Sequence, residues 1–258
     1  IIRNTITGGK HSGIAVSGGS FARIGGDPRS GVSQGNTIQS SENGIAVQDS
    51  SNAILKYNTV NSNSNSGLHV DNNASVILAE GNTFSNNSAY GIRVWLGGSL
   101  VMWGDAQLTS PTTISGNTKG PIRVDEGGSA YLKNLTLTSQ SKGIRIENGN
   151  FVKLENVTIT GSGEYGIDVL GTNIGLEHTT ISGSTDVEIR AKYYSTINLD
   201  NTTITGTADS NEIDLRYGSI LTLGSNSSVT GTVTCGNTSP DNGTFVNDSG
   251  TTVTTSGC

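Results

Sequence analysis

Four pairs of side chains, each two residues apart, carry most of the chemistry that this sequence offers. The pairs are His69 with Asp71, Arg93 with Trp95, Arg123 with Asp125, and Arg145 with Glu147. A guanidinium group can hold a carboxylate with two hydrogen bonds, and an aromatic face can cover the apolar side of a sugar ring. A histidine beside an aspartate is also a candidate proton-transfer pair. These residue types indicate binding of an acidic glycan, or chemistry on one.

Each pair begins at the x of a recurring Gly-Ile-x-Val motif, and the motif predicts the elements that position the pairs. Its first apolar residue is residue 14, 45, 68, 92, 122, 144 or 167, with weaker copies at Val187-Glu188-Ile189 and Ile213-Asp214-Leu215. Two further ladders of short runs with alternating apolar residues lie between the copies, separated by Gly, Asn and Ser. Period-two runs bounded by turn formers are typical of strands, and a repeat of this length indicates a solenoid.

Three strands per repeat predict an all-β fold, a right-handed single-stranded parallel β-helix of about ten coils, where one coil is one turn of three strands. Strand alternation then turns the x residues outward in one column: Ala15, Ala46, His69, Arg93, Arg123, Arg145, Asp168, Glu188 and Asp214. A second outward column lies two residues further on: Ser17, Gln48, Asp71, Trp95, Asp125, Glu147, Leu170, Arg190 and Arg216. Opposite charges face each other along most of this sheet, including Glu188 with Arg190 and Asp214 with Arg216.

The chain resembles the pectin-lyase-like superfamily of right-handed parallel β-helices across nearly its whole length. The resemblance depends on asparagines that recur before one strand of each coil and are similar to that superfamily's stacked asparagine ladder: Asn36, Asn58, Asn82, Asn134, Asn156 and Asn201. Asparagine tolerates the left-handed backbone of a tight turn, and its amide can bond to the next asparagine in the stack. Many chemistries share this architecture, so the fold alone does not define a function.

The resemblance implies a set of catalytic residues if the protein is an enzyme. Its lyases use an Arg or Lys base and often Ca²⁺, which implies Arg123 or Arg145 as the base and Asp71, Asp125 and Glu147 as calcium ligands. An epimerase would use His69 beside Asp71. The sequence departs from the enzymes, however, because it has no Asp-Pro-His-Glu run and no Asn-Thr-Asp, Asp-Asp or Gly-His-Gly set. The long excursions, 25–34 and 103–111, also lie away from the Gly-Ile-x-Val strands, so an open binding face is favoured over a catalytic cleft.

The charged columns have a second interpretation as a solvated lattice of salt bridges. Three arginines stacked at about 4.8 Å would repel one another, and neighbouring acids would offset that repulsion. Both interpretations are retained.

Composition indicates an extracellular or cell-surface protein. The net charge is −6, the 15 Lys and Arg residues form no run, and no apolar stretch is long enough for a membrane helix, so neither nucleic acid nor membrane insertion is expected. The chain opens on a repeat without Met or a signal peptide, which suggests part of a longer protein. No cofactor or metal is expected, apart from Ca²⁺ in the lyase alternative.

Two cysteines, Cys235 and Cys258, follow the last clear repeat. A disulfide between them would restrain the unfolded chain by roughly 3 kcal/mol and fits an oxidising compartment. We therefore divide the chain into a β-helix over 1–231 and a disulfide-clipped C-terminal cap over 232–258, which would protect the last coil from pairing with another chain.

The sequence as a whole predicts a secreted or surface module, structural or adhesive, that binds a polysaccharide on the Gly-Ile-x-Val sheet. A lyase or epimerase acting on uronic-acid glycans is the first alternative. A phage-type fibre or tailspike segment is the second, because β-helices can self-associate as trimers without a coiled coil.

Overall fold

The computed structural model describes residues 1–27, 34–103, 110–138, 140–206, 211–236, 243–248, 250 and 252–258. Within these ranges every regular element is a β-strand. The strands make about nine turns with three parallel sheets, which confirms the predicted all-β solenoid, although the sequence indicated about ten turns. The chain divides into two compact units, Ile1–Leu135 (unit 1) and Thr136–Cys258 (unit 2). Most of both long excursions, 28–33 and 104–109, lies outside the described residues.

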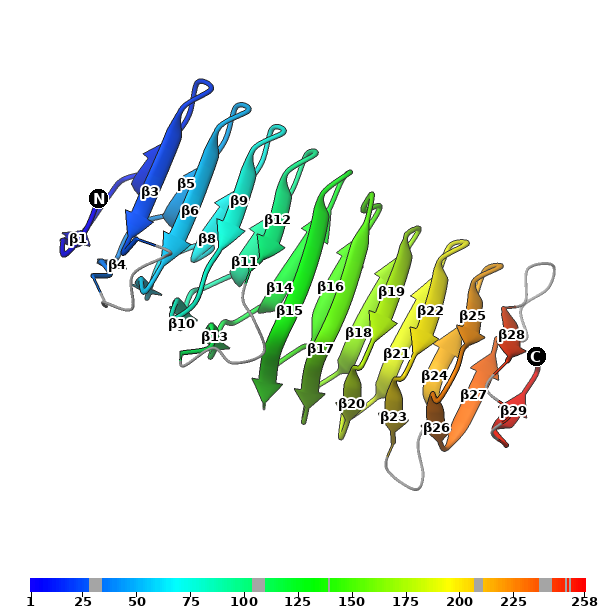
Figure 1. The fold of residues 1–258 in the computed structure, drawn as a ribbon. Coiled ribbons are helices and arrows are strands. Elements are labelled where there is room, and N and C mark those ends of the chain that lie inside the picture. Colours follow the sequence, from blue (N-terminus) through cyan, green and yellow to red (C-terminus); the bar gives the residue numbers. More distant parts are fainter. Residues whose placement is uncertain are drawn as a thin grey trace. The chain divides into compact units, whose positions relative to one another are not determined.

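In unit 1 each strand pairs in parallel with its equivalents in the neighbouring coils (Figure 1). Sheet A consists of β1 (Thr5–Thr7), β4 (Thr37–Gln39), β7 (Thr59–Asn61), β10 (Thr83–Ser85) and β13 (Thr113–Ser115). Sheet B, made of the Gly-Ile-x-Val strands, consists here of β2 (Ser12–Val16), β5 (Asn43–Val47), β8 (Leu68–Val70), β11 (Tyr90–Val94) and β14 (Gly120–Asp125). Sheet C consists of β3 (Phe21–Gly25), β6 (Asn52–Lys56), β9 (Ser75–Leu78), β12 (Ser99–Met102) and β15 (Ser129–Thr138), which continues into unit 2.

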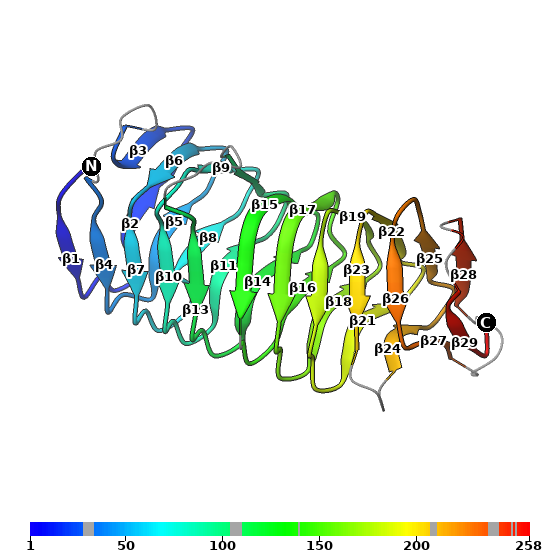
Figure 2. The same cartoon turned by 60° about the horizontal axis from the view of Figure 1, so that its bottom comes forward.

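Unit 2 repeats the same coil, as the second view of the ribbon makes clear (Figure 2). Its sheet B strands are β16 (Ile144–Glu147), β18 (Tyr165–Leu170), β21 (Val187–Lys192), β24 (Asn211–Leu215), β27 (Thr232–Cys235) and β29 (Thr254–Ser256). Its sheet C strands are β17 (Val152–Thr160), β19 (Asn173–Glu177), β22 (Thr196–Asp200), β25 (Ile220–Leu223) and β28 (Thr244–Asn247). The last run of β17 pairs with β20 (Thr180–Ser182), which is followed in the same stack by β23 (Thr203–Thr205) and β26 (Ser228–Thr230).

The core of each unit consists of identical positions stacked one coil apart. In sheet B, Ile45 pairs with Leu68 and Leu68 with Ile92, and all three are fully buried. Each such side chain contributes about 1.5–3 kcal/mol when buried. The glycine of the motif is explained by close approach, because a Cβ on Gly44 would lie 2.1 Å from Cγ1 of Val60. The motif therefore specifies both a packed strand and a close contact at its first residue, which is glycine in every clear copy except the one that has Pro121.

An asparagine ladder forms in unit 1 at the corner between sheets C and A. Nδ2 of Asn36 donates to Oδ1 of Asn58 at 2.8 Å, and Nδ2 of Asn58 donates to Oδ1 of Asn82 at 3.0 Å. All three side chains are buried, at 2%, 0% and 0% exposure. This part of the predicted ladder is confirmed.

The other three asparagines assigned to the ladder do not belong to it, so that prediction was wrong for them. Asn134, Asn156 and Asn201 have left-handed backbones, with φ of 52°, 54° and 47°. The position that follows each of them is the buried one, and it holds Leu135, Val157 and Thr202. Two adjacent positions of this corner thus hold asparagine, and the outer one has the left-handed backbone; at that position Nδ2 of Asn226 donates to Oδ1 of Asn201 at 3.2 Å.

A second asparagine ladder, not predicted from the sequence, lies at the corner that leads into sheet B. Nδ2 of Asn63 donates to Oδ1 of Asn87, and Nδ2 of Asn87 donates to Oδ1 of Asn117, both at 2.9 Å. Asn63, Asn87 and Asn117 are buried. These two ladders satisfy the polar groups of corners that the solenoid cannot expose to water.

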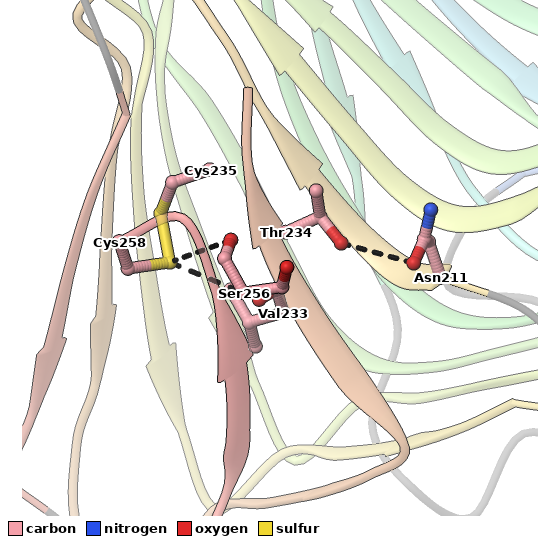
Figure 3. The surroundings of a disulfide bond; sticks show 6 residues. All are labelled: Asn211, Val233, Thr234, Cys235, Ser256 and Cys258. Carbon is pink, nitrogen blue, oxygen red and sulfur yellow. Dashed lines mark hydrogen bonds between the residues drawn. A yellow bond between two sulfur atoms is a disulfide. The ribbon is translucent and has the colours of Figure 1, made fainter. Parts of the chain in front are cut away.

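The C-terminal segment 232–258 adds strands to unit 2. β27 pairs with β24, β28 with β25 and β29 with β27, all in parallel. Cys235 and Cys258 form the predicted disulfide, with Cα atoms 4.7 Å apart (Figure 3). Nearby, Oγ1 of Thr234 donates to Oδ1 of Asn211 at 2.9 Å (Figure 3). The disulfide therefore joins the end of β27 to the end of the chain.

No helix in the described part of the chain has the length and apolarity needed to cross a membrane.

Candidate functional site

The outward face of sheet B in unit 1 brings six of the predicted residues together. The strand register places Ala46, His69, Arg93 and Arg123 in one column. Asp71, Trp95 and Asp125 follow two residues later on the same chain segments. We call these six residues, His69, Asp71, Arg93, Trp95, Arg123 and Asp125, the unit 1 patch.

Asp125 is the centre of charge in the unit 1 patch. Its side chain is only 1% exposed, and its Oδ2 lies 3.0 Å from Nη2 of Arg93 and 2.7 Å from Nε of Arg123. The two arginine side chains are about one-quarter exposed. Two arginines therefore share one buried carboxylate, and parts of both arginine side chains remain at the surface.

His69 and Trp95 form the other side of the patch. Nε2 of His69 lies 3.1 Å from Oδ2 of Asp71, and the His69 ring meets the Trp95 ring edge to face at 6.0 Å. The guanidinium of Arg93 lies 4.7 Å from the centre of the Trp95 ring, a cation–π contact. Burial lowers the pKa of His69 below its usual value, against the opposing effect of Asp71. The imidazole is therefore neutral near pH 7.

Several buried polar atoms of the patch have no hydrogen-bond partner among the described residues. They are Nδ1 of His69, Oδ1 of Asp71, Nε1 of Trp95 and Oδ1 of Asp125. Buried polar groups in proteins are nearly always paired, so each unpaired one calls for an explanation. The patch thus carries more hydrogen-bonding capacity than its own side chains use.

Tyr90 is a member of this site that the sequence did not reveal. Nη1 of Arg123 donates to its hydroxyl at 3.3 Å, and the Arg123 guanidinium lies 5.8 Å from its ring centre. Tyr90 lies two residues before Ile92, so period-two alternation assigns it to the interior. Its burial agrees with that assignment, but its hydroxyl reaches the arginine of the next coil.

The register in unit 2 corrects one predicted column. Ile167 pairs with Ile189, not with Val187, so Asp168 is opposite Arg190, and Arg190 is opposite Asp214. Glu188 therefore does not belong to the outward column, and Lys192 takes the place in the second column that Arg190 was assigned. Glu188 is instead buried at the corner and accepts the backbone N–H of Ser184 at 3.1 Å. Burial raises the pKa of Glu188.

The outward face of unit 2 is a series of ion pairs. Arg145 pairs with Glu147 at 3.0 Å and Arg216 with Asp214 at 2.9 Å, as the sequence predicted. Arg190 pairs with Asp168 of the preceding coil at 2.7 Å rather than with Glu188. The Arg190 guanidinium also lies 5.0 Å from the Tyr165 ring, and burial together with Asp168 raises the pKa of Tyr165 to about 12. These contacts are those of the salt-bridge lattice that the sequence left as an alternative.

The described residues contain no group of three or more His, Cys, Asp or Glu side chains that could hold a metal ion. Asp71 and Asp125 of unit 1 are each engaged by a histidine or by arginines.

The stacked parallel sheets are the architecture of a β-helix. A family model described as "Right handed beta helix region" matches residues 1–118 and 121–258. The chain belongs to the right-handed β-helix family. No curated protein and no solved structure matches it.

Proposed function

We propose that this β-helix is a secreted or cell-surface module that binds a polysaccharide through the unit 1 patch. The observation that carries the proposal is the Arg93–Asp125–Arg123 triad beside Trp95. The arginines of the triad offer guanidinium N–H donors to a uronate carboxylate, and the half-buried Trp95 ring offers a surface for a sugar ring. The Cys235–Cys258 disulfide supports an oxidising, extracellular location.

The test is binding to immobilised or dissolved polysaccharides. Gel retardation and calorimetry would compare polygalacturonate and alginate with the neutral polymer pullulan. Trp95→Ala and Arg123→Gln should each weaken binding by about tenfold or more, because they remove an aromatic contact and a charge-assisted one. Phe21→Ala and Arg23→Gln are matched controls, since both residues are exposed on β3 of the same unit.

Unchanged binding in Trp95→Ala and Arg123→Gln would contradict the proposal. The proposal would also be contradicted if Phe21→Ala and Arg23→Gln weakened binding as much as Trp95→Ala and Arg123→Gln do. The effect would then depend on net charge or on exposed apolar surface in general.

A lyase or epimerase acting at the same patch is the second candidate, and the His69–Asp71 pair favours it. The neutral imidazole held 3.1 Å from a carboxylate could accept a proton from a uronate ring carbon. Incubation with uronans, with and without Ca²⁺, would reveal a lyase by the ultraviolet absorbance of its unsaturated product and an epimerase by NMR. Product formation abolished by His69→Ala would replace the binding proposal with an enzymatic one.

A further inference from the structure

Three exposed tyrosines gather on two neighbouring turns of unit 2. Tyr193 and Tyr194 lie between β21 and β22, and Tyr217 lies between β24 and β25. Their exposures are 53%, 67% and 39%. We call Tyr193, Tyr194 and Tyr217 the tyrosine platform.

The backbone of the platform is left-handed at all three tyrosines. The φ angles of Tyr193, Tyr194 and Tyr217 are 59°, 60° and 52°. The equivalent turns of unit 1 also hold left-handed residues, among them Ser50, Asn73, Leu96 and Glu126. The left-handed backbone is therefore a general feature of these turns, and the platform is distinguished by its three aromatic side chains.

The rings are held in place before any ligand binds. Tyr193 and Tyr217 are stacked, with ring centres 5.1 Å apart and planes 7° from parallel. Tyr194 lies over Gly218, where an added Cβ would be 2.6 Å from its ring carbons. The glycine thus leaves the space that the Tyr194 ring occupies. Preorganised aromatic rings bind with little further loss of entropy.

Lys192 gives the platform an available positive charge. It directly precedes Tyr193, and no carboxylate in the described part of unit 2 forms an ion pair with it. The neighbouring cations are already engaged, Arg190 with Asp168 and Arg216 with Asp214. Burial lowers the pKa of Lys192, and Arg190 and Arg216 lower it further, so an anion beside this ammonium group would relieve repulsion.

We propose that the tyrosine platform and Lys192 form a second carbohydrate site, specific for an anionic sugar. The outer ring faces stack on sugar rings, and Nζ of Lys192 pairs with the carboxylate or sulfate of the sugar. The inference shares its ligand class with the proposed function but depends on residues of unit 2 alone.

The experiment measures retardation and calorimetric binding of polygalacturonate, dextran sulfate and pullulan. In the double variant Tyr193→Asn with Tyr217→Asn, affinity for the anionic polymers should fall by about tenfold or more. Asparagine adopts the same backbone at Asn72 and Asn148, so the fold is retained. Lys192→Gln should reduce binding of the anionic polymers and weaken its dependence on salt. Phe151→Ala, at a side chain 58% exposed in the same unit, should have no effect.

Unchanged binding of the anionic polymers in the double tyrosine variant would overturn the inference. Light scattering would show whether the wild type is an oligomer. If it is, and the double tyrosine variant is a monomer with unchanged polymer binding, the inference is also overturned and the platform is assigned to self-association. A wild-type chain that none of the three polymers retards would contradict it as well.

The two carbohydrate proposals fail separately. Loss of binding in Trp95→Ala alone supports the unit 1 patch and contradicts the platform. Loss in the double tyrosine variant alone supports the platform and contradicts the patch.

Discussion

Single side chains in the unit 1 patch combine burial with charge in a way that links stability to pH. His69 is 8% exposed and has one ring nitrogen beside Asp71 and the other without a partner among the described residues. The charged groups that act on it are Asp71, Arg93 and Asp125. Burial is the largest of these influences and favours the neutral imidazole.

We expect acid to destabilise the protein partly through His69. The pKa of His69 is lowered in the folded state, whereas an unfolded histidine has a pKa of about 6.5. Below about pH 6.5 the unfolded chain binds a proton at this histidine more readily than the folded protein does. The contribution of His69 to stability is therefore constant above about pH 6.5 and falls as the pH decreases toward the folded pKa. Urea unfolding midpoints between pH 7.5 and pH 5 should fall less in His69→Gln than in the wild type.

Carboxylates elsewhere titrate in both the wild type and His69→Gln. The difference between the two plots of urea midpoint against pH therefore gives the effect of His69. Parallel slopes would show that His69 has the same pKa in the folded and the unfolded protein, which would contradict this expectation.

Among the elements, the corner between sheets C and A shows why two asparagines of the same motif have different roles. Asn58 is fully buried and donates its amide hydrogens to Asn82 and to the backbone carbonyl of Ile24. Asn156 is exposed and has a left-handed backbone within β17. Asn58 thus forms hydrogen bonds inside the core, whereas Asn156 lies at the surface in a backbone conformation that asparagine tolerates.

We therefore expect opposite sensitivities to substitution. Asn58→Leu should lower the free energy of unfolding by about 3 kcal/mol, because it leaves the amide of Asn36 and the carbonyl of Ile24 without their partner. Asn156→Gly should lower it by less, because the side chain is exposed and glycine adopts the same left-handed backbone without strain. Urea denaturation followed by circular dichroism measures both. Equal losses in the two variants would contradict this division of roles.

The elements also show what could be predicted from the sequence. Gly-Ile-x-Val encodes both a buried strand and a close corner, so the coil and the charged face of sheet B followed from its spacing. The register failed at Val187-Glu188-Ile189 because both apolar residues are buried and no glycine marks which one starts the motif. The alternation of apolar and polar residues shows which face of the sheet a side chain lies on, but not which neighbour it contacts. The pairing of Arg190 with Asp168 of the preceding coil was therefore not predictable.

On the scale of the whole molecule, each coil contacts only its neighbours, as in other solenoids. The free energy of unfolding of each unit is therefore approximately a sum of contributions from its coils and from the contacts between adjacent coils. The end of unit 2 has a covalent restraint in addition, because Cys235 and Cys258 are joined. The strands between them, β28 and β29, are largely exposed and therefore bury little apolar surface of their own.

Removing this disulfide should cost about 3 kcal/mol of unfolding free energy in the chain-entropy model, given the 23-residue separation of its cysteines. Cys258→Ser in the absence of reductant and the wild type in dithiothreitol should show the same lowered urea midpoint. A wild type that dithiothreitol leaves unchanged, with the bond demonstrably reduced, would contradict the expected restraint.

The amide ladder of unit 1 has a direction, and the direction limits how the protein can acquire new coils. Asn4, Asn36 and Asn58 each donate to the Oδ1 of the asparagine one coil later. A coil inserted into this series by gene duplication must bring a side chain that accepts from one neighbour and donates to the other. Duplications that copy an asparagine-bearing coil meet this requirement at once, whereas copies of the coils with Leu135 or Val157 would interrupt the series. Growth of the repeat by single coils is therefore favoured within unit 1 only when the copied coil carries an asparagine of this ladder.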